Sequence, residues 1–311
     1  MKRKQFLQAL FLSTASLAVT SRSSLTRAKE NSKVILGQID LSFYQVKGAL
    51  VRAVLEEMGY TVEVKERLHE EMFPLLNSGE IDLLVAAWLP EAHASYWSEV
   101  KDSSTVLTTL YDNAYFFWAV PDYVPESAVR EIGDLAKPEV AAKMNKTIQG
   151  IGQGASITTF SQNAVKEYGL SQRLLRRATT EPALTVGELG YQLLTGEAEE
   201  WVVAFEEAVS REEWAILPVW QPQYLNQAYS LRELQDPLRV LGSNNRGVIV
   251  ATNSFIEKFP ASDLEKLQNI SLDIDAVNEM DYMVNVEEKT PQEAAQIWIS
   301  ANRDRYKSWL N

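Results

Sequence analysis

The chain of 311 residues contains no cysteine and only two histidines, His69 and His93. The lack of cysteine excludes disulfides, thiol catalysis, cysteine-ligated zinc and a lipid-modified N-terminal cysteine. Two histidines fall short of the usual zinc ligand set, so a zinc site would need many carboxylates. We therefore predict neither a metal site nor a cofactor.

Acidic residues are missing from the first 28 residues, although the whole chain has a net charge of −12. A basic stretch at residues 2–4 precedes an apolar stretch at residues 6–19, and residues 26–28 resemble a cleavage site. This pattern predicts a signal peptide over residues 1–28 and an exported, periplasmic protein. The alternative is a retained membrane anchor. The strong negative charge argues against nucleic-acid binding.

Long apolar runs are absent after this segment, and short ones alternate with helical patterns. We expect a strand at 34–39, a helix at 46–58, a strand at 61–64, a helix at 69–76 and a strand at 81–87. A βαβαβ order of this kind implies a parallel sheet with right-handed crossovers.

Composition changes near residues 113–121 and 236–247 divide the rest of the chain. They predict one lobe, residues 118–242, inserted between two parts of another, residues 33–117 and 243–311. The predicted fold class is α/β: two lobes with mixed, mainly parallel sheets, joined by two crossover segments. Such an arrangement suits a hinged cleft. A single continuous sheet is the alternative.

The local pattern inside the inserted lobe is weaker. Residues 189–195 favour a helix, and residues 200–204 and 215–219 are rich in residues that favour strands.

Two of the predicted strands end in tryptophan. The strand at 81–87 leads to Trp88, and His93 follows shortly after. A second apolar run ends at Trp220 and is followed by Tyr224. Open α/β sheets bind ligands at the carboxyl ends of strands, a Trp face attracts cations, and a nearby His can meet an anion. The pattern indicates a small zwitterion as ligand. The alternative is that these rings fill the core.

A glycine-rich turn provides a possible anion site. Gly152-Gln153-Gly154-Ala155-Ser156 lies between a predicted strand at 147–151 and a predicted helix at 157–168. Small residues let backbone amides approach a ligand, and a helix N-terminus favours an anion such as a carboxylate. The motif lacks the spacing and the lysine of phosphate-binding loops. A plain tight turn is the alternative.

Phe43 and Tyr44 follow the first strand, on the same predicted rim as Trp88. Either ring could join an aromatic cage around a cation. The alternative is a packed loop.

These segments together resemble the glycine betaine/proline betaine-binding proteins of osmoprotectant ABC importers, a family with the bilobal periplasmic-binding-protein fold. The resemblance covers roughly residues 34–300. It rests on four segments: Trp88-Leu89-Pro90-Glu91-Ala92-His93, the Gly152–Ala155 turn, Trp220-Gln221-Pro222-Gln223-Tyr224 and the C-terminal residues 291–299.

The resemblance implies a role for several residues. Trp88 and Trp220 would form two walls of a cage around a trimethylammonium group. His93 and the backbone amides of Gly154 and Ala155 would bind the carboxylate. Family members carry a third Trp at positions that here hold Leu41 and Gln153, so Phe43 or Tyr44 is expected to substitute.

Other functions need different residues. A hydrolase would need Ser156 or another serine beside His93, and the chain has no Gly-x-Ser-x-Gly motif. An amino-acid or polyamine receptor on the same scaffold could use Arg246 to bind a carboxylate. Choline and carnitine are further possible ligands.

The sequence thus predicts a substrate-binding protein, not an enzyme. It would capture glycine betaine or a related quaternary ammonium zwitterion and deliver it to a membrane permease.

Overall fold

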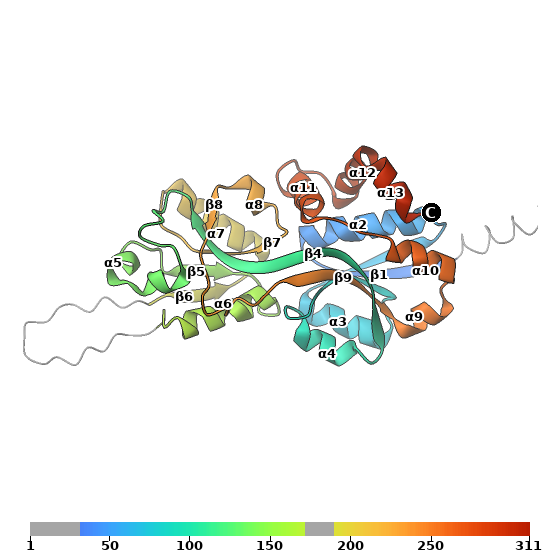
Figure 1. Ribbon diagram of the computed structural model, residues 1–311, viewed down its shortest axis with the longest axis horizontal. Coiled ribbons are helices and arrows are strands. Elements are labelled where there is room, and N and C mark those ends of the chain that lie inside the picture. The colour runs from blue at the N-terminus through green and yellow to red at the C-terminus, as the bar shows by residue number, and fades with distance from the viewer. Residues whose placement is uncertain (1–31, 172–189) are drawn as a thin grey trace, which may run out of the picture.

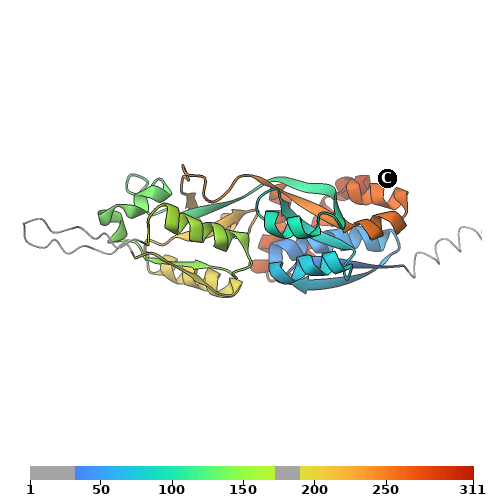
Figure 2. The ribbon, with the colours of Figure 1, turned by 90° about the horizontal axis from the view of Figure 1, so that it is seen from below.

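The computed structural model describes residues 32–171 and 190–311. The predicted signal peptide lies outside these residues. The described elements gather in two lobes, and the long strand β4 (Ser104–Pro121) runs from one lobe into the other (Figure 1). The view from below shows the same two groups of elements side by side along the longest axis (Figure 2).

The first lobe contains both ends of the described chain, and helices cover its sheet. Its elements are β1 (Lys33–Ile39), α2 (Ser42–Glu57), β2 (Thr61–Arg67), α3 (His69–Ser78), β3 (Leu83–Leu89), α4 (Ala94–Val100), β9 (Asn245–Thr252), α9 (Asn253–Lys258), α10 (Ala261–Gln268), α11 (Ile274–Asn285), α12 (Pro291–Ala301) and α13 (Arg303–Trp309).

The second lobe is built from the middle of the chain. Its elements are η1 (Ile132–Ala136), α5 (Pro138–Ala141), β5 (Thr147–Gly150), α6 (Ser156–Glu167), β6 (Gln192–Thr195), α7 (Ala198–Ser210), β7 (Leu217–Gln221), α8 (Leu225–Ala228) and β8 (Leu231–Glu233).

Seven strands form one mixed sheet with the order β2-β1-β3-β9-β4-β7, and β8 pairs with β4. The expected βαβαβ unit is confirmed, because β1 pairs in parallel with both β2 and β3. The mixed α/β class is also confirmed. The predicted majority of parallel strand pairs is not confirmed. The pairs β3–β9, β4–β9, β4–β7 and β4–β8 are antiparallel, and among the strands of the described residues only β5–β6 adds a further parallel pair. The returning strand β9 lies between β3 and β4 and runs antiparallel to both, which accounts for much of the antiparallel pairing.

Buried hydrophobic residues form two clusters, and the larger cluster extends from the first lobe into the second. The smaller cluster lies in the second lobe and includes Trp118 and Ile148. The larger fills the first lobe and continues into the second through Trp201, Leu217 and Trp220. The chain passes between the lobes within β4 and again before β9. The exact lobe boundaries at 117/118 and 242/243 stay a prediction.

Two local predictions in the second lobe are wrong. Residues 192–195 of the expected helix form strand β6, which pairs with β5, while residue 189 lies outside the described residues. Residues 200–204, expected in a strand, lie in helix α7. The helix is recognisable only over a longer stretch of sequence, in which Trp201, Phe205 and Ala208 are buried at helical spacing.

Within residues 32–171 and 190–311, no helix has the length and apolar character needed to cross a membrane.

Candidate ligand-binding site

A small pocket lies where the two lobes meet, and we call it the central pocket. It has a volume of about 20 Å³, roughly the space of one water molecule. Its lining residues are Leu41, Phe43, Tyr44, His69, Trp88, His93, Phe116, Ile151, Ala155, Ser156, Ile157 and Trp220.

Trp88 and Trp220 reach the central pocket from opposite lobes. Trp88 lies at the end of β3, in which every residue is buried, and Trp220 lies near the end of β7. Phe43 joins the two indoles, with ring centroids 5.9 Å from Trp88 and 5.6 Å from Trp220. Six of the eight residues predicted for the site, these three included, line this one pocket. The other three are Tyr44, His93 and Ala155.

The sequence did not predict two aromatic residues, one that lines the central pocket and one that packs behind Trp220. Phe116 of β4 is paired with Trp220 of β7, and its ring centroid lies 5.3 Å from that of Trp88. Trp201 of α7 stacks on Trp220 at 4.9 Å with an interplanar angle of 14°. The helical spacing of apolar residues in α7 would have indicated that Trp201 belongs to a buried helix face. Phe116 gives no comparable local signal, because its position depends on strand register.

The ring of His93 is held in one tautomer. Its Nδ1 accepts a hydrogen bond from the backbone amide of Trp88 at 3.0 Å, so the proton of the neutral ring is assigned to Nε2. Burial lowers the pKa of His93 well below its ordinary value, and the nearby His69 and Lys47 lower it further. A neutral His93 therefore offers one N–H donor, which suits a carboxylate.

His69 lies next to His93 in the wall of the central pocket, with ring centroids 5.3 Å apart. Burial lowers the pKa of His69 to about 4. Both rings are consequently uncharged near pH 7, and this end of the pocket is polar without a fixed charge.

The glycine-rich turn leads into α6 at the same end of the pocket. The amide of Ala155 donates to the carbonyl of Gly152 at 3.1 Å, within the turn itself. The first amides of a helix have no intrahelical acceptor, so those of Ser156 and Ile157 are candidate anion donors too. Gly154 lines an adjacent pocket rather than the central one.

Two contacts join the lobes beside this turn. The Tyr96 hydroxyl donates to the carbonyl of Gly154 at 2.8 Å. The Ser156 hydroxyl donates to the carbonyl of Ala92. Because Tyr96 and Ala92 belong to the first lobe, these bonds stabilise the closed arrangement.

Phe43 and Tyr44 have a second neighbour besides the pocket. The Lys47 ammonium lies 4.3 Å from the centroid of Phe43 and 4.2 Å from that of Tyr44. The two rings that we predict to contact the cation of a ligand therefore already contact a cation of the protein itself, the Lys47 ammonium.

Tyr224 lies outside the central pocket, in a larger outer pocket of about 400 Å³ that Phe43 and Trp220 also line. Its backbone amide donates to the Asp281 carboxylate of α11 at 2.7 Å. This bond is a further contact between the lobes.

The competing functions find little support in this geometry. Ser156 donates to a backbone carbonyl and His93 Nδ1 is already an acceptor for Trp88, so these two residues form no nucleophile–base pair. Arg246 is exposed. Among the described residues, no Asp or Glu lines the central pocket and no cluster of three or more His, Cys, Asp or Glu could hold a metal ion.

Two α/β lobes closing on an aromatic pocket define the class of bilobal substrate-binding proteins. The family model described as "Substrate binding domain of ABC-type glycine betaine transport system" matches residues 32–189 and 174–301. The chain belongs to this family.

Individual relatives agree with this assignment. The Listeria monocytogenes glycine betaine/carnitine transport binding protein GbuC is 25% identical over 176 residues, which are 57% of this chain and 53% of that protein. The chain thus spans about half the length of this relative.

Solved structures share the fold. Lactococcal OpuAC in its closed form with glycine betaine has a TM-score of 0.75 and 21% identity, covering 90% of this chain and 100% of that one. ProX from Borrelia burgdorferi has a TM-score of 0.76 and 21% identity, covering 90% and 97%. A choline-binding protein in complex with choline has a TM-score of 0.74 and 17% identity, covering 91% and 92%.

Proposed function

We propose that this protein is an exported, periplasmic substrate-binding protein of an ABC importer. It captures glycine betaine, or a related quaternary ammonium zwitterion, and delivers it to a membrane permease. The observation that carries the proposal is the convergence of Trp88 and Trp220, from different lobes, on one pocket that also contains a neutral His93.

The aromatic walls suit the ammonium end of the ligand. A quaternary nitrogen has no N–H to donate, so carboxylates offer it no hydrogen bond, whereas ring faces offer charge attraction and apolar contact together. Each desolvated face contributes on the order of 1–2 kcal/mol. The absence of Asp and Glu from the described lining disfavours a primary ammonium, which would need such a partner.

The opposite end suits a carboxylate. His93 Nε2–H and the first amides of α6 are hydrogen-bond donors, and both kinds of donor suit a carboxylate. In the aromatic wall itself, the indole Nε1 of Trp220 is a buried donor with no hydrogen-bond partner in the described part of the chain. A ligand oxygen would satisfy a donor of this kind.

Ligand entry requires the lobes to separate. The central pocket has room for about one water molecule, and glycine betaine is several times larger. Opening breaks the bonds of Tyr96 and Ser156 to the opposite lobe. Ligand contacts with both lobes then favour closure.

Calorimetric titration with glycine betaine, proline betaine, carnitine, choline and glycine tests the ligand class. We expect glycine betaine to bind and glycine to compete poorly, because an aromatic pocket rewards methylation of the nitrogen. Equal competition by glycine, or turnover of any of these compounds, would contradict the proposal.

Small-angle scattering tests the motion. The radius of gyration of the ligand-free protein should fall when glycine betaine saturates it. An unchanged scattering profile at saturation would argue against closure.

A further inference from the structure

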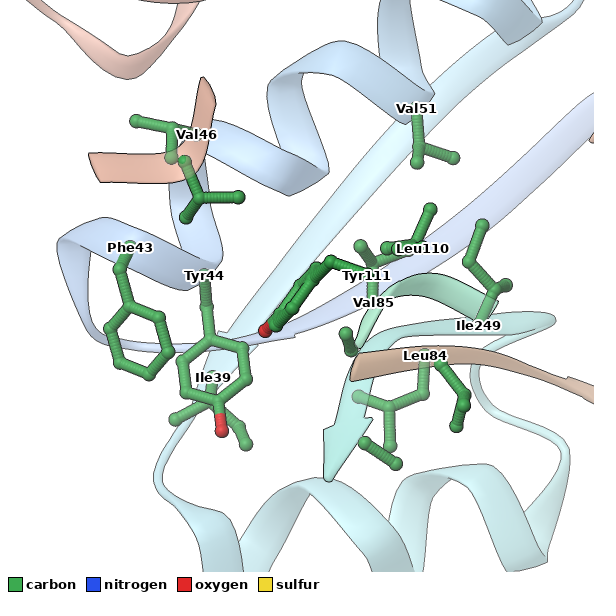
Figure 3. Close-up of a cluster of buried hydrophobic side chains, with 14 of the residues drawn as sticks. Ile39, Phe43, Tyr44, Val46, Val51, Leu84, Val85, Leu110, Tyr111 and Ile249 are labelled. Atoms are coloured by element: carbon green, nitrogen blue, oxygen red, sulfur yellow. The ribbon is translucent and has the colours of Figure 1, made fainter. Parts of the chain in front are cut away.

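A buried lysine lies directly behind the aromatic wall of the central pocket. Lys47 of α2 has no exposed surface, and its Nζ donates to the hydroxyl of Tyr111 at 2.8 Å. Ring centroids of Phe43, Tyr44 and Tyr111 lie 4.3, 4.2 and 4.9 Å from Nζ. Figure 3 shows these three rings grouped near the start of α2.

The same side chains connect Lys47 to the pocket. The Tyr111 hydroxyl also accepts a hydrogen bond from Trp88 Nε1 at 2.7 Å. Phe43, Tyr44 and Trp88 line the central pocket. One layer of aromatic rings therefore separates the Lys47 ammonium from the space assigned to the ligand.

Other titratable groups surround Lys47 on each side. Asp281 of α11 is fully buried, and its charge opposes the effect of burial, which lowers the pKa of Lys47. Tyr44 lies on the same helix and Tyr111 on β4. His93, just before α4, lies near enough for the charge on Lys47 to lower the pKa of His93. Three ring faces, the Tyr111 hydroxyl oxygen and the Asp281 carboxylate favour the ammonium form of Lys47, against the burial that lowers its pKa.

We propose that Lys47 is a specificity-determining residue that makes the pocket prefer a zwitterion over a cation that has no carboxylate. The inference rests on the proposed function, since it assumes that quaternary ammonium compounds bind in the central pocket.

The preference follows from the two charges of the ligand. A positive Lys47 repels the ammonium group of glycine betaine and of choline alike. Only glycine betaine has a carboxylate that Lys47 attracts in return. Charges about 10 Å apart at an effective dielectric constant near 20 change a binding constant by about tenfold. Lys47 thus lowers the affinity for choline relative to betaine by about that factor.

Lys47→Met tests this, because methionine fills a similar volume without the charge. The dissociation constants of glycine betaine and choline are measured by calorimetry for wild type and variant. We expect the choline-to-betaine ratio of dissociation constants to fall about tenfold in K47M. If Lys47 had a purely structural role, its loss would weaken the binding of both ligands equally and leave the ratio of dissociation constants unchanged. A K47M ratio within twofold of the wild-type ratio therefore overturns the inference.

Controls isolate the buried charge. Lys47→Arg keeps the charge and should keep the wild-type ratio. Lys65→Met removes one positive charge from β2, where Lys65 pairs with Glu80, and should also leave the ratio unchanged. If K47M does not fold, Lys47→Gln replaces it, since glutamine is neutral and can still donate to Tyr111.

The two proposals fail in different ways. A wild-type protein that binds neither compound contradicts the proposed function. Wild-type binding with an unaltered ratio in the neutral Lys47 variants contradicts only the role of Lys47.

Discussion

The indole of Trp88 has two separate environments. Its Nε1 donates to Tyr111, inside the first lobe, while the ring lies against Phe43 and Phe116 at the central pocket. The hydrogen bond fixes the orientation of the ring, which determines the ring surface that faces the central pocket. Preorganised contacts of this kind reduce the entropy lost on binding.

Trp88→Ala should weaken glycine betaine binding at least tenfold. The substitution removes one ring face that we propose to bind the cation, worth about 1.4 kcal/mol or more. Calorimetry measures the change. Trp309→Ala is the matched control, because Trp309 is equally buried but lies on α13, away from the pocket. Loss of stability without loss of affinity is expected for the control, and unchanged affinity in W88A would remove Trp88 from the site.

His93→Ala should reduce the affinity for glycine betaine more than the affinity for choline. Choline has no carboxylate to lose a hydrogen bond, whereas betaine loses the Nε2–H donor. Titrating both ligands against wild type and variant gives the comparison. Equal losses for the two ligands would argue against contact between His93 and the carboxylate.

At the scale of elements, the glycine-rich turn before α6 shows why two nearby glycines differ. A Cβ on Gly154 would overlap the carboxylate of Glu70, on α3 of the other lobe, and approach the Tyr96 hydroxyl to 3.2 Å. A Cβ on Gly152 would meet no atom within 4 Å. Of these two glycines, only Gly154 lies where an added methyl group would force a side chain of the other lobe, that of Glu70, to move.

Gly154→Ala should weaken glycine betaine binding several-fold, because the added methyl group opposes closure. Gly152→Ala is the control and should bind as wild type does. Glu70→Ala in the G154A background should restore part of the affinity, since it removes the overlapping side chain. Calorimetry measures the glycine betaine affinity of wild type, of the two single variants and of the double variant. Equal affinities for G154A and G152A would contradict this account.

Local pattern was enough to predict some elements and not others. The strands β1 to β3 and the helices between them have clear periods, and the position of Trp88 and His93 after a strand followed from these. Helix α7 was missed because the window at 200–204 was shorter than two helical turns. Nothing in the sequence indicated that Phe116 lines the pocket or that Lys47 lies behind its wall, because strand register and tertiary packing bring them there.

At the scale of the whole molecule, the two histidines link stability to pH. The pKa of His69 is about 4 in the folded protein, below its ordinary value of 6.5. A group with a lowered folded pKa contributes stability that is present above its unfolded pKa and is lost as the pH falls through the folded one. Acidification from pH 6.5 to 4 should therefore destabilise the protein.

His69→Gln should reduce this acid sensitivity. The shift of His69 corresponds to about 3 kcal/mol between the two pH values. Urea unfolding at pH 7 and pH 4 measures the free energy of unfolding for both proteins. The loss on acidification should be smaller in H69Q by an amount of this order. An identical loss in both proteins would show that His69 titrates normally in the folded state.

The strand β4 has a mechanical consequence for both lobes. It pairs with β9 in the first lobe and with β7 and β8 in the second, so one strand joins the parts of the sheet that lie in the two lobes. Its pairing with β9 is irregular between Tyr111 and Ala114, where Asn113 has a φ of 60°. Bulges bend strands and increase their twist. Any rotation of the lobes must bend or twist this strand, so its elasticity limits the direction and amplitude of the movement.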